Sequence, residues 1–278
     1  QNIKSKKKVI ACVVARMNST RLPRKSLLDI EGKSLIMRII ERLNESKTID
    51  QVVICTSDHP DDIVLIDLAK KHDYIGYIAG SEQDVLSRLI DAAKKYDADI
   101  VLRVTGDNPF TDSYIIDQLV EHHIKTEAEY TRTINLPIGV TPDVLSSSML
   151  PKLHQCMSDP NESEYLSLFA MDHSLFKCEL LDAPDKMNRP YYSLTIDTPN
   201  DIEKVRVLYK KFMRTGHIPS LLEVIEEMDK YIDENGNRRD DNATASLPGI
   251  QSGAFGGGTD GYVGFDALGN QMGTTTRT

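Results

Sequence analysis

The stretch VIACVVARMNSTRLPRK occupies residues 9–25 and joins an apolar run to a strongly basic loop. The apolar run has the length and β-branched content of a buried strand. The loop carries Arg16, Arg21, Arg24 and Lys25, although the whole chain has a net charge of −9. Guanidinium forks, hydroxyls and an ammonium on one loop can hold a triphosphate, so we expect a polyanion to bind here. A solvated basic turn would carry the same charges, but three later segments weigh against it.

Outward from this loop, strand-like and helix-like patterns alternate. The spacing predicts strands at 8–14, 51–56, 100–105, 130–133, 176–181 and 191–196. It predicts helices at 34–45, 61–72, 84–96, 113–126, 162–172, 200–215 and 219–232. This rhythm predicts an α/β fold, with a mostly parallel sheet, flanking crossover helices and a small antiparallel insertion.

Composition narrows the class of protein. A chain of 278 residues with 40% hydrophobic content can form one sizeable domain, and we expect a cytoplasmic enzyme. The negative net charge argues against nucleic-acid binding, and no apolar stretch reaches the ~20 residues of a membrane helix. The four cysteines lack C-x-x-C spacing and are expected to be free thiols.

Three regions are predicted. Residues 1–7 are expected to be a flexible N-terminus and residues 8–232 the main domain. Ten of the sixteen glycines fall in residues 233–278, where little apolar content offsets the entropy of ordering. We expect a disordered tail or linker there, with the start of a further module as the alternative.

Two other phosphate-binding signatures are excluded. Gly32-Lys33-Ser34 has the end of a P-loop, but Leu27 stands where that motif requires its first glycine. No G-x-G-x-x-G follows the first strand, so the dinucleotide fingerprint is absent as well. The basic loop is therefore expected to bind phosphates mainly through side chains.

Two aspartates are candidate ligands for a divalent cation, which commonly bridges a protein carboxylate and the oxygens of a bound triphosphate. Asp107 follows the predicted strand 100–105, and Asp197 follows the predicted strand 191–196. The carboxyl ends of strands are where α/β sheets present ligands. Each aspartate also has a purely structural interpretation, Asp107 as a turn residue and Asp197 as a helix cap.

These segments resemble those of the CMP-sugar synthetases, or cytidylyltransferases, and most closely the spore-coat-polysaccharide-type branch. Residues 15–25 match A-R-x-x-S-T-R-L-P-x-K, residues 103–109 match R-x-T-G-D-x-P, and residues 197–201 match D-T-P-x-D. The resemblance covers about residues 8–230 and extends to acylneuraminate and 3-deoxy-manno-octulosonate cytidylyltransferases. It implies a Rossmann-like, glycosyltransferase-A-type nucleotidyltransferase sheet, a homodimer, and transfer of CMP from CTP to a small acceptor, typically a sugar acid.

The resemblance also implies roles for individual residues. It implies that the nucleotide is bound by Ala15, Arg16, Asn18, Ser19, Arg21, Lys25, Gly80, Ser81 and Asp107. Within this set, Arg16, Lys25 and Asp107 are the implied catalytic residues, and Asp107 with Asp197 would bind Mg²⁺. The turn at Gly80 and Ser81 would face the cytosine, while Asp84 and Arg88 can simply pair along a helix. For Arg24, a contact with the γ-phosphate and exposure to solvent are equal alternatives.

The acceptor side departs from the family pattern. Residues 136–141 read LPIGVT where relatives have P-D-G-x-D, and residues 163–165 read SEY where relatives have R-E-H. Arg103, Arg132 and Arg189 are the candidate acceptor-binding residues. No histidine is an obvious general base, because His122, His123 and His154 are expected on helix surfaces.

The sequence leaves other functions open. A transferase of the same fold could activate a phosphate monoester or phosphonate instead of a sugar acid. A non-catalytic nucleotide-binding module is the second class, but the joint presence of Lys25, Asp107 and Asp197 argues against it, because a scaffold needs no metal site.

Overall fold

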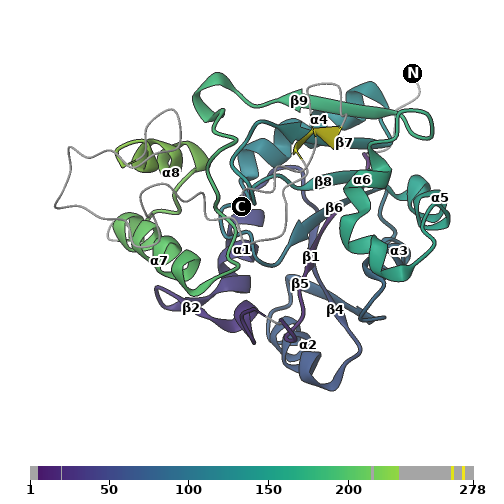
Figure 1. The fold of residues 1–278 in the computed structure, drawn as a ribbon. Helices are drawn as coiled ribbons and strands as arrows, with labels where there is room; N and C mark the ends of the chain where they lie inside the picture. Colours follow the sequence, from purple (N-terminus) through teal and green to yellow (C-terminus); the bar gives the residue numbers. More distant parts are fainter. Residues whose placement is uncertain (1–5, 20, 214–215, 232–263, 266–270, 273–278) are drawn as a thin grey trace.

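A seven-stranded sheet forms the centre of the protein (Figure 1). The computed structural model describes residues 6–19, 21–213, 216–231, 264–265 and 271–272. The sheet order is β5-β4-β1-β6-β8-β7-β9. The strands are β1 (Val9–Val14), β4 (Gln51–Ser57), β5 (Ile75–Gly80), β6 (Ile100–Thr105), β7 (Tyr130–Ile134), β8 (Asp143–Ser146) and β9 (Cys178–Asp182). All neighbouring pairs are parallel except those of β8, which runs antiparallel to both β6 and β7.

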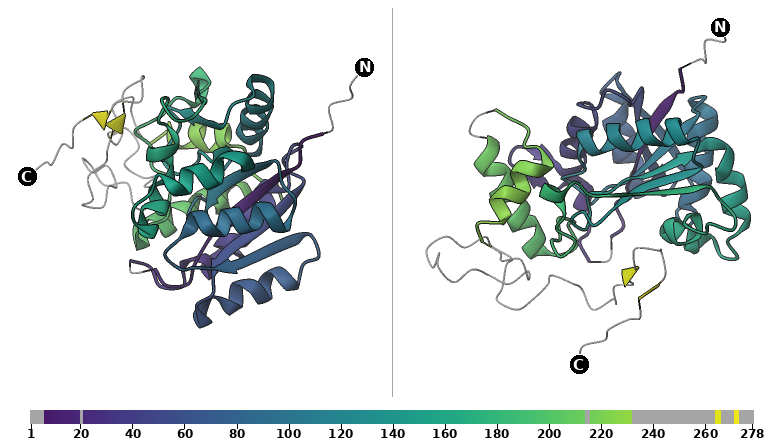
Figure 2. Two further views of the ribbon diagram at one scale, coloured as in Figure 1. Left: turned by 90° about the vertical axis from the view of Figure 1, so that its right-hand side faces the viewer. Right: turned by 90° about the horizontal axis from the view of Figure 1, so that it is seen from above.

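Helices cover both faces of this sheet (Figure 2). One face packs on α1 (Leu35–Leu43), α2 (Ile63–Lys70), α4 (Ser113–Thr126), α7 (Pro199–Met213) and α8 (Leu221–Met228). The other packs on α3 (Val85–Lys95), α5 (Leu150–Gln155) and α6 (Leu166–Ala170). Strand β1 serves both cores because its side chains alternate: Val9, Ala11 and Val13 face the first, Ile10 and Cys12 the second. The predicted α/β architecture is confirmed.

Short elements complete the chain. The basic loop ends in a 3-10 helix at Lys25–Leu27, and a hairpin of β2 (Asp29–Ile30) and β3 (Lys33–Ser34) leads into α1. A second 3-10 helix, Pro160–Tyr165, precedes α6. Strands β10 (Gly264–Phe265) and β11 (Gln271–Met272) pair antiparallel with each other. The rest of the predicted tail, 233–278, lies outside the described residues, as do residues 1–5 of the predicted N-terminus.

Three sequence predictions about structure are wrong or incomplete. Residues 191–196 form no strand, because their backbone bonds to a loop and makes only the single bridge between Ile138 and Ser193. Strands β5 and β8 were not predicted. His123 is not a surface residue: it is buried, with Nδ1 at 2.8 Å from Thr131 Oγ1 and Nε2 at 2.9 Å from Ser146 Oγ.

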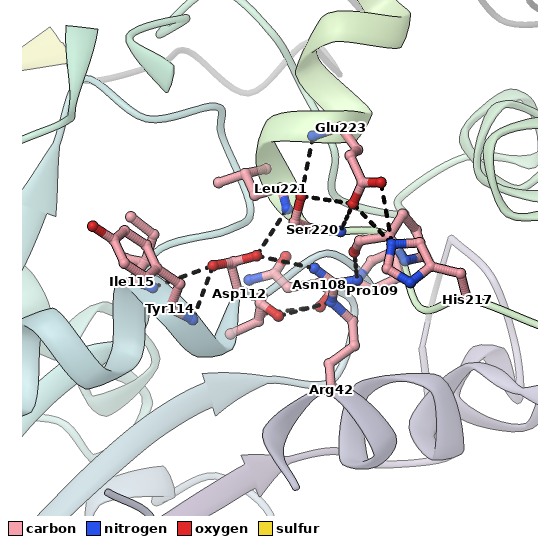
Figure 3. Close-up of polar contacts among 12 residues, drawn as sticks. Arg42, Asn108, Pro109, Asp112, Tyr114, Ile115, His217, Ser220, Leu221 and Glu223 are labelled. Carbon is pink, nitrogen blue, oxygen red and sulfur yellow. Dashed lines mark hydrogen bonds and ion pairs between the residues drawn. The ribbon is translucent and has the colours of Figure 1, made fainter. Parts of the chain in front are cut away.

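Asp112 ties three helices together (Figure 3). It caps α4 by accepting from the N–H groups of Tyr114 and Ile115, at 3.0 and 3.2 Å. It also accepts from the N–H of Leu221 at 2.8 Å, at the first residue of α8, and pairs with Arg42 of α1 at 3.4 Å. Arg42 donates further to the carbonyl of Thr111 at 2.9 Å. This buried network fixes α8 against the sheet.

Within the described residues, the helices are too short or too polar for any of them to cross a lipid bilayer.

Candidate active site

A cavity of about 300 Å³ opens at the carboxyl ends of β1 and β6. Most of its wall comes from the basic loop that follows β1 and from the segment that follows β6. Helix α3, the 3-10 helix before α6 and Asp197, two residues before α7, supply the remainder. The polar and charged lining residues are Arg16, Asn18, Ser19, Arg21, Lys25, Ser26, Arg88, Arg103, Thr105, Asp107, Glu164 and Asp197.

Lys25 gathers two carboxylates at one end of this cavity. Its Nζ lies 3.0 Å from Asp107 Oδ2 and 3.6 Å from Asp197 Oδ1, and it donates to the carbonyl of Ile196 at 3.1 Å. Arg21 reaches the same Asp197 oxygen at 3.4 Å. The side chains of Lys25, Asp107 and Asp197 are partly exposed, at 17–27%, so water screens their interactions in part, and it screens those of the more exposed Arg21 further. The loop and the two aspartates therefore converge as a single charged cluster.

The cluster has the donor set of a magnesium site. Asp107 Oδ1 is buried and has no hydrogen-bond partner, which leaves a carboxylate oxygen available to a ligand. Among the described residues, no three His, Cys, Asp or Glu side chains form a group that could hold a metal by themselves. Mg²⁺ is commonly held by one or two carboxylates together with substrate phosphate, so the two aspartates fit this ion.

Backbone contacts fix the position of the basic loop. The N–H of Met17 donates to Asp62 Oδ1 at 2.6 Å, and the N–H of Ala15 donates to the carbonyl of Cys55 at 3.1 Å. Ala15 can therefore offer a ligand only its carbonyl. Gly106 passes so close to β1 that an added Cβ would lie 2.8 Å from the carbonyl of Val14, which requires glycine there. Arg24 is exposed and outside the cavity lining.

Glu164 contributes an acid that the sequence did not reveal as part of the site. It pairs with Arg16 at 2.9 Å, and both side chains are partly exposed at the cavity. In the sequence, residues 163–165 stand out only by their departure from the family pattern. Nothing in the sequence indicates that this segment returns to the first loop, because the two lie far apart along the chain.

Arg103 lies beside a buried acid at the cavity wall. Its Nε is 3.4 Å from Asp143 Oδ2, and its Nη1 is buried without a partner. Asp143 also accepts from the Tyr130 hydroxyl at 2.6 Å. Burial, with the Asp143 charge, raises the pKa of Tyr130, which keeps the hydroxyl protonated as a donor.

Some predicted site residues lie elsewhere. Gly80 and Ser81 do not line the cavity, and Ser81 Oγ accepts from the N–H of Asp84 at 3.2 Å. Arg132 does not line the cavity either; burial acts to lower its pKa, but Tyr130 and Asp143 raise it overall. Arg189 is bound to Asp229 at 2.8 Å, away from the lining residues.

Asp84 and Arg88 do not form the pair that their spacing on helix α3 would allow. Asp84 caps α3 through the N–H of Ser87 and contacts His154 at 2.7 Å. Arg88 instead lines the cavity. A helix pattern alone does not reveal this, because it places Arg88 one turn after Asp84 in either case.

Comparison with known proteins identifies relatives over most of the chain. A family model described as cytidylyltransferase matches residues 10–228. The spore coat polysaccharide biosynthesis protein SpsF of Bacillus subtilis is 31% identical over 209 residues, covering 73% of this chain and 87% of that protein. The 3-deoxy-manno-octulosonate cytidylyltransferase of Chloroherpeton thalassium is 30% identical over 156 residues, covering 55% of this chain and 61% of that protein. The solved structure of a cytidylyltransferase from Leptospira borgpetersenii matches with a TM-score of 0.71 and 29% identity, covering 81% of this chain and 94% of that one.

Proposed function

Since the chain belongs to the cytidylyltransferase family, we propose that it transfers CMP from CTP to a hydroxyl group of a sugar acid and releases pyrophosphate. The observation that carries the proposal is the convergence of Lys25, Asp107 and Asp197 at one end of a cavity lined by the basic loop. A nucleotide-binding scaffold would not need paired carboxylates beside its phosphate-binding cations.

In this reaction the acceptor oxygen attacks the α-phosphorus of CTP in line with the bond that leads to the β-phosphate. A new phosphorus–oxygen bond forms, the bond to pyrophosphate breaks, and the acceptor loses its proton. The protein's contribution is positioning and charge stabilisation. Arg16, Arg21 and Lys25 would hold the phosphates by charge-assisted hydrogen bonds, and the side chains of Asn18 and Ser19 can add neutral ones.

Asp107 and Asp197 would hold Mg²⁺. When bound, this ion supplies positive charge at the phosphates and lowers the pKa of an oxygen that it contacts. Two observations support this assignment. Asp107 Oδ1 has no hydrogen-bond partner, and Asp197 lies beside the same lysine, Lys25. Lys25 would keep the two carboxylates close together in the absence of substrate.

The acceptor is proposed from the relatives and from charge. One matched relative is named for acting on 3-deoxy-manno-octulosonate, a sugar acid, and another for spore coat polysaccharide biosynthesis. Arg103, whose Nη1 is buried and without a partner, offers a donor suited to an acceptor carboxylate. We propose that the CMP-activated sugar is used to make a surface polysaccharide. We also propose that the enzyme acts in the cytoplasm as a homodimer.

The test is an assay of pyrophosphate release from CTP and Mg²⁺ with a panel of sugar acids, phosphosugars and phosphonates. Release with a sugar acid, and formation of its CMP derivative, is the expected result. Activity only with a phosphate monoester or phosphonate would show that the acceptor belongs to that class and is not a sugar acid. Absence of CTP binding would refute the cytidylyltransferase activity itself.

A further inference from the structure

Lys204 is a lysine that the fold buries in the second turn of α7. It is 6% exposed, and the acid beside it, Asp201, is 8% exposed. The Nζ of Lys204 lies 3.3 Å from Asp201 Oδ1 and donates to the carbonyl of Ser193 at 2.7 Å. Lysine is among the residues that proteins bury least often, and a buried ion pair adds little net stability because both charges lose their hydration. Stability alone therefore does not account for this pair.

Asp201 and Lys204 both bind the segment that leads to Asp197. Asp201 Oδ2 accepts from the N–H of Asp197 at 3.1 Å and from the N–H and the hydroxyl of Thr198, each at 2.8 Å. Lys204 binds the same segment four residues earlier, at the carbonyl of Ser193. The segment forms no strand and lacks the hydrogen-bond ladder that would fix it in the sheet. The buried pair therefore supplies anchors that pairing with a strand does not.

The peptide group between Ile196 and Asp197 is held from two sides. Its carbonyl accepts from Lys25 Nζ at 3.1 Å, and its N–H donates to Asp201 at 3.1 Å. A peptide group is planar, so these two bonds together fix the direction in which the chain enters Asp197. Lys25 lines the cavity, whereas Asp201 and Lys204 are not among the lining residues. The buried pair thus holds the peptide group from behind the cavity wall.

The carboxylate of Asp197 depends on this backbone for its direction. Its own contacts are long: Lys25 Nζ lies 3.6 Å away, Arg21 Nη2 lies 3.4 Å away and Thr195 Oγ1 lies 3.5 Å away. Polar contacts of this length are weak and orient a side chain poorly. The position of the carboxylate is therefore set mainly by the peptide group that precedes it.

Helix capping explains only part of this arrangement. Thr198 and Asp201 form a reciprocal capping pair at the start of α7, since the N–H of Asp201 also donates to Thr198 Oγ1 at 3.3 Å. Ser220 and Glu223 form the same kind of pair at the start of α8 (Figure 3). The side chain of Glu223 is 39% exposed, and that of its partner His217 is 53% exposed. A capping pair therefore needs no buried lysine.

We propose that Asp201 and Lys204 are positioning residues, which hold the carboxylate of Asp197 beside Asp107 for binding Mg²⁺. The inference rests on the proposed function, because it concerns how that site keeps a metal ligand in place. Lys204 also neutralises Asp201, so this further acid does not repel the two carboxylates of the site. Loss of a residue that supports a metal ligand commonly weakens metal binding by about 10- to 100-fold.

The experiment is titration calorimetry of the full chain with CTP, first with Mg²⁺ and then with EDTA. The ratio of the two affinities measures how much Mg²⁺ strengthens CTP binding, and Asp197→Asn gives the ratio that remains when this metal ligand is removed. Asp201→Ala and Lys204→Met should each lower the wild-type ratio by about 10-fold, while CTP affinity in EDTA stays within about twofold. Asp201→Asn keeps one acceptor oxygen for the N–H of Asp197, so it should keep more of the ratio than Asp201→Ala.

A double variant separates positioning from folding. Asp201→Ala combined with Lys204→Met removes both charges of the buried pair, so it should melt only about 2–4 °C below wild type, as expected for a lost helix cap. Glu223→Ala removes the corresponding acid of the exposed capping pair on α8, and it should melt in the same range. Only the double variant should lose the effect of Mg²⁺ on CTP affinity. An equal loss in Glu223→Ala would overturn the proposal, because the loss would then follow from destabilisation alone.

Three further results would also overturn the proposal, in distinguishable ways. A wild-type ratio of affinities in Asp201→Ala and in the double variant would make Asp201 a helix cap only and leave the proposed function standing. The same ratio in wild type and Asp197→Asn would remove the metal role of Asp197 and, with it, the need to position this residue. Failure of the wild-type protein to bind CTP would refute the proposed function together with this inference.

Discussion

Asp107 and Asp197 both lie close to one nitrogen, Lys25 Nζ, at 3.0 and 3.6 Å. In the sequence, Asp107 comes before strand β7 and Asp197 comes after strand β9. Two carboxylates that lie so near one point would repel each other if no cation stood between them. The ammonium of Lys25 therefore stabilises this arrangement when no ligand is bound. The same charge can serve a triphosphate when one is bound. The two aspartates and the lysine therefore act as one unit.

Asp107→Asn should lower turnover about 10²- to 10³-fold, because it removes an anionic ligand from the transition-state environment. The melting temperature should change little, since the pair with Lys25 is partly exposed and Asp197 still faces the lysine. Steady-state kinetics of pyrophosphate release would measure the effect. Asp67→Asn, at an exposed position on α2, is the matched control. Near wild-type turnover in Asp107→Asn would return that residue to a turn role.

Glu164→Gln should tighten CTP binding by about two- to fivefold, because it releases Arg16 from its 2.9 Å pair and removes an acid from the cavity. The gain should shrink at high salt, as expected for an exposed pair. Calorimetry at two ionic strengths would measure it, with Glu226→Gln on α8 as the exposed control. Weaker binding in Glu164→Gln would show that Glu164 contacts the nucleotide directly.

His123 should make stability depend on pH between about 4 and 6.5. Burial, with a smaller effect of neighbouring His122, lowers the pKa of His123 from 6.5 to about 4. The unfolded chain therefore binds a proton that the folded chain refuses, so stability falls as pH drops through this window, by on the order of 2–3 kcal/mol. Urea unfolding of His123→Gln should show a flatter pH profile, and His122→Gln should keep the wild-type slope. Identical slopes in wild type and His123→Gln would contradict the assignment.

Asp112→Ala should destabilise the protein by about 3–5 kcal/mol, because it leaves Arg42 buried without its carboxylate. It also removes the cap of α4 and the acceptor for the first N–H of α8 (Figure 3). Urea unfolding followed by circular dichroism would give the difference. Asp67→Ala should stay within about 0.5 kcal/mol of wild type. A loss below 1 kcal/mol in Asp112→Ala would mean that water replaces the carboxylate.

Deletion of residues 233–278 should leave folding and CTP binding intact. The family match ends at residue 228, and the described strands β10 and β11 pair with each other. Melting and calorimetry of the truncated chain would check this. Aggregation or a broadened melt would show that the segment packs on the domain.

The alternation of apolar runs and helical spacing was enough to predict the sheet and most of its helices. The same pattern gave a wrong prediction where a segment is buried but does not pair with a neighbouring strand. Tyr192, Leu194 and Ile196 are buried in the alternation of a strand, but their backbone bonds to Ile138 and to the carbonyl of Asp107. Periodicity reports burial, and an extended segment lying on the core gives the same pattern as a strand. Strand β8 is only four residues long, and β5 contains two glycines, so both gave weak signals.

The candidate site was predictable where its residues are contiguous in sequence and unpredictable where they are not. The loop from Ala15 to Lys25 carries its charges together, and all the residues assigned to it line the cavity. Arg88 and Glu164 line the same cavity, but their roles depend on how α3 and the 3-10 helix pack against the loop. Only the tertiary arrangement shows that Arg88 lacks acceptors while Arg38 has them.

Strand β8 enters the sheet at the edge where the cavity lies, because it runs antiparallel to β6 and pairs Asp143 with Arg103. The connection before it, residues 135–142, therefore begins at the same edge of the sheet as the connections after parallel strands β1 and β6, which carry the basic loop and Asp107 of the cavity lining. Leu136 and Val140 in this connection are buried in the core, and Gly139 has a positive φ with Thr195 close by. A combinatorial library that alters this edge of the sheet would therefore vary the half-buried Ile138 and Thr141 and keep those three residues.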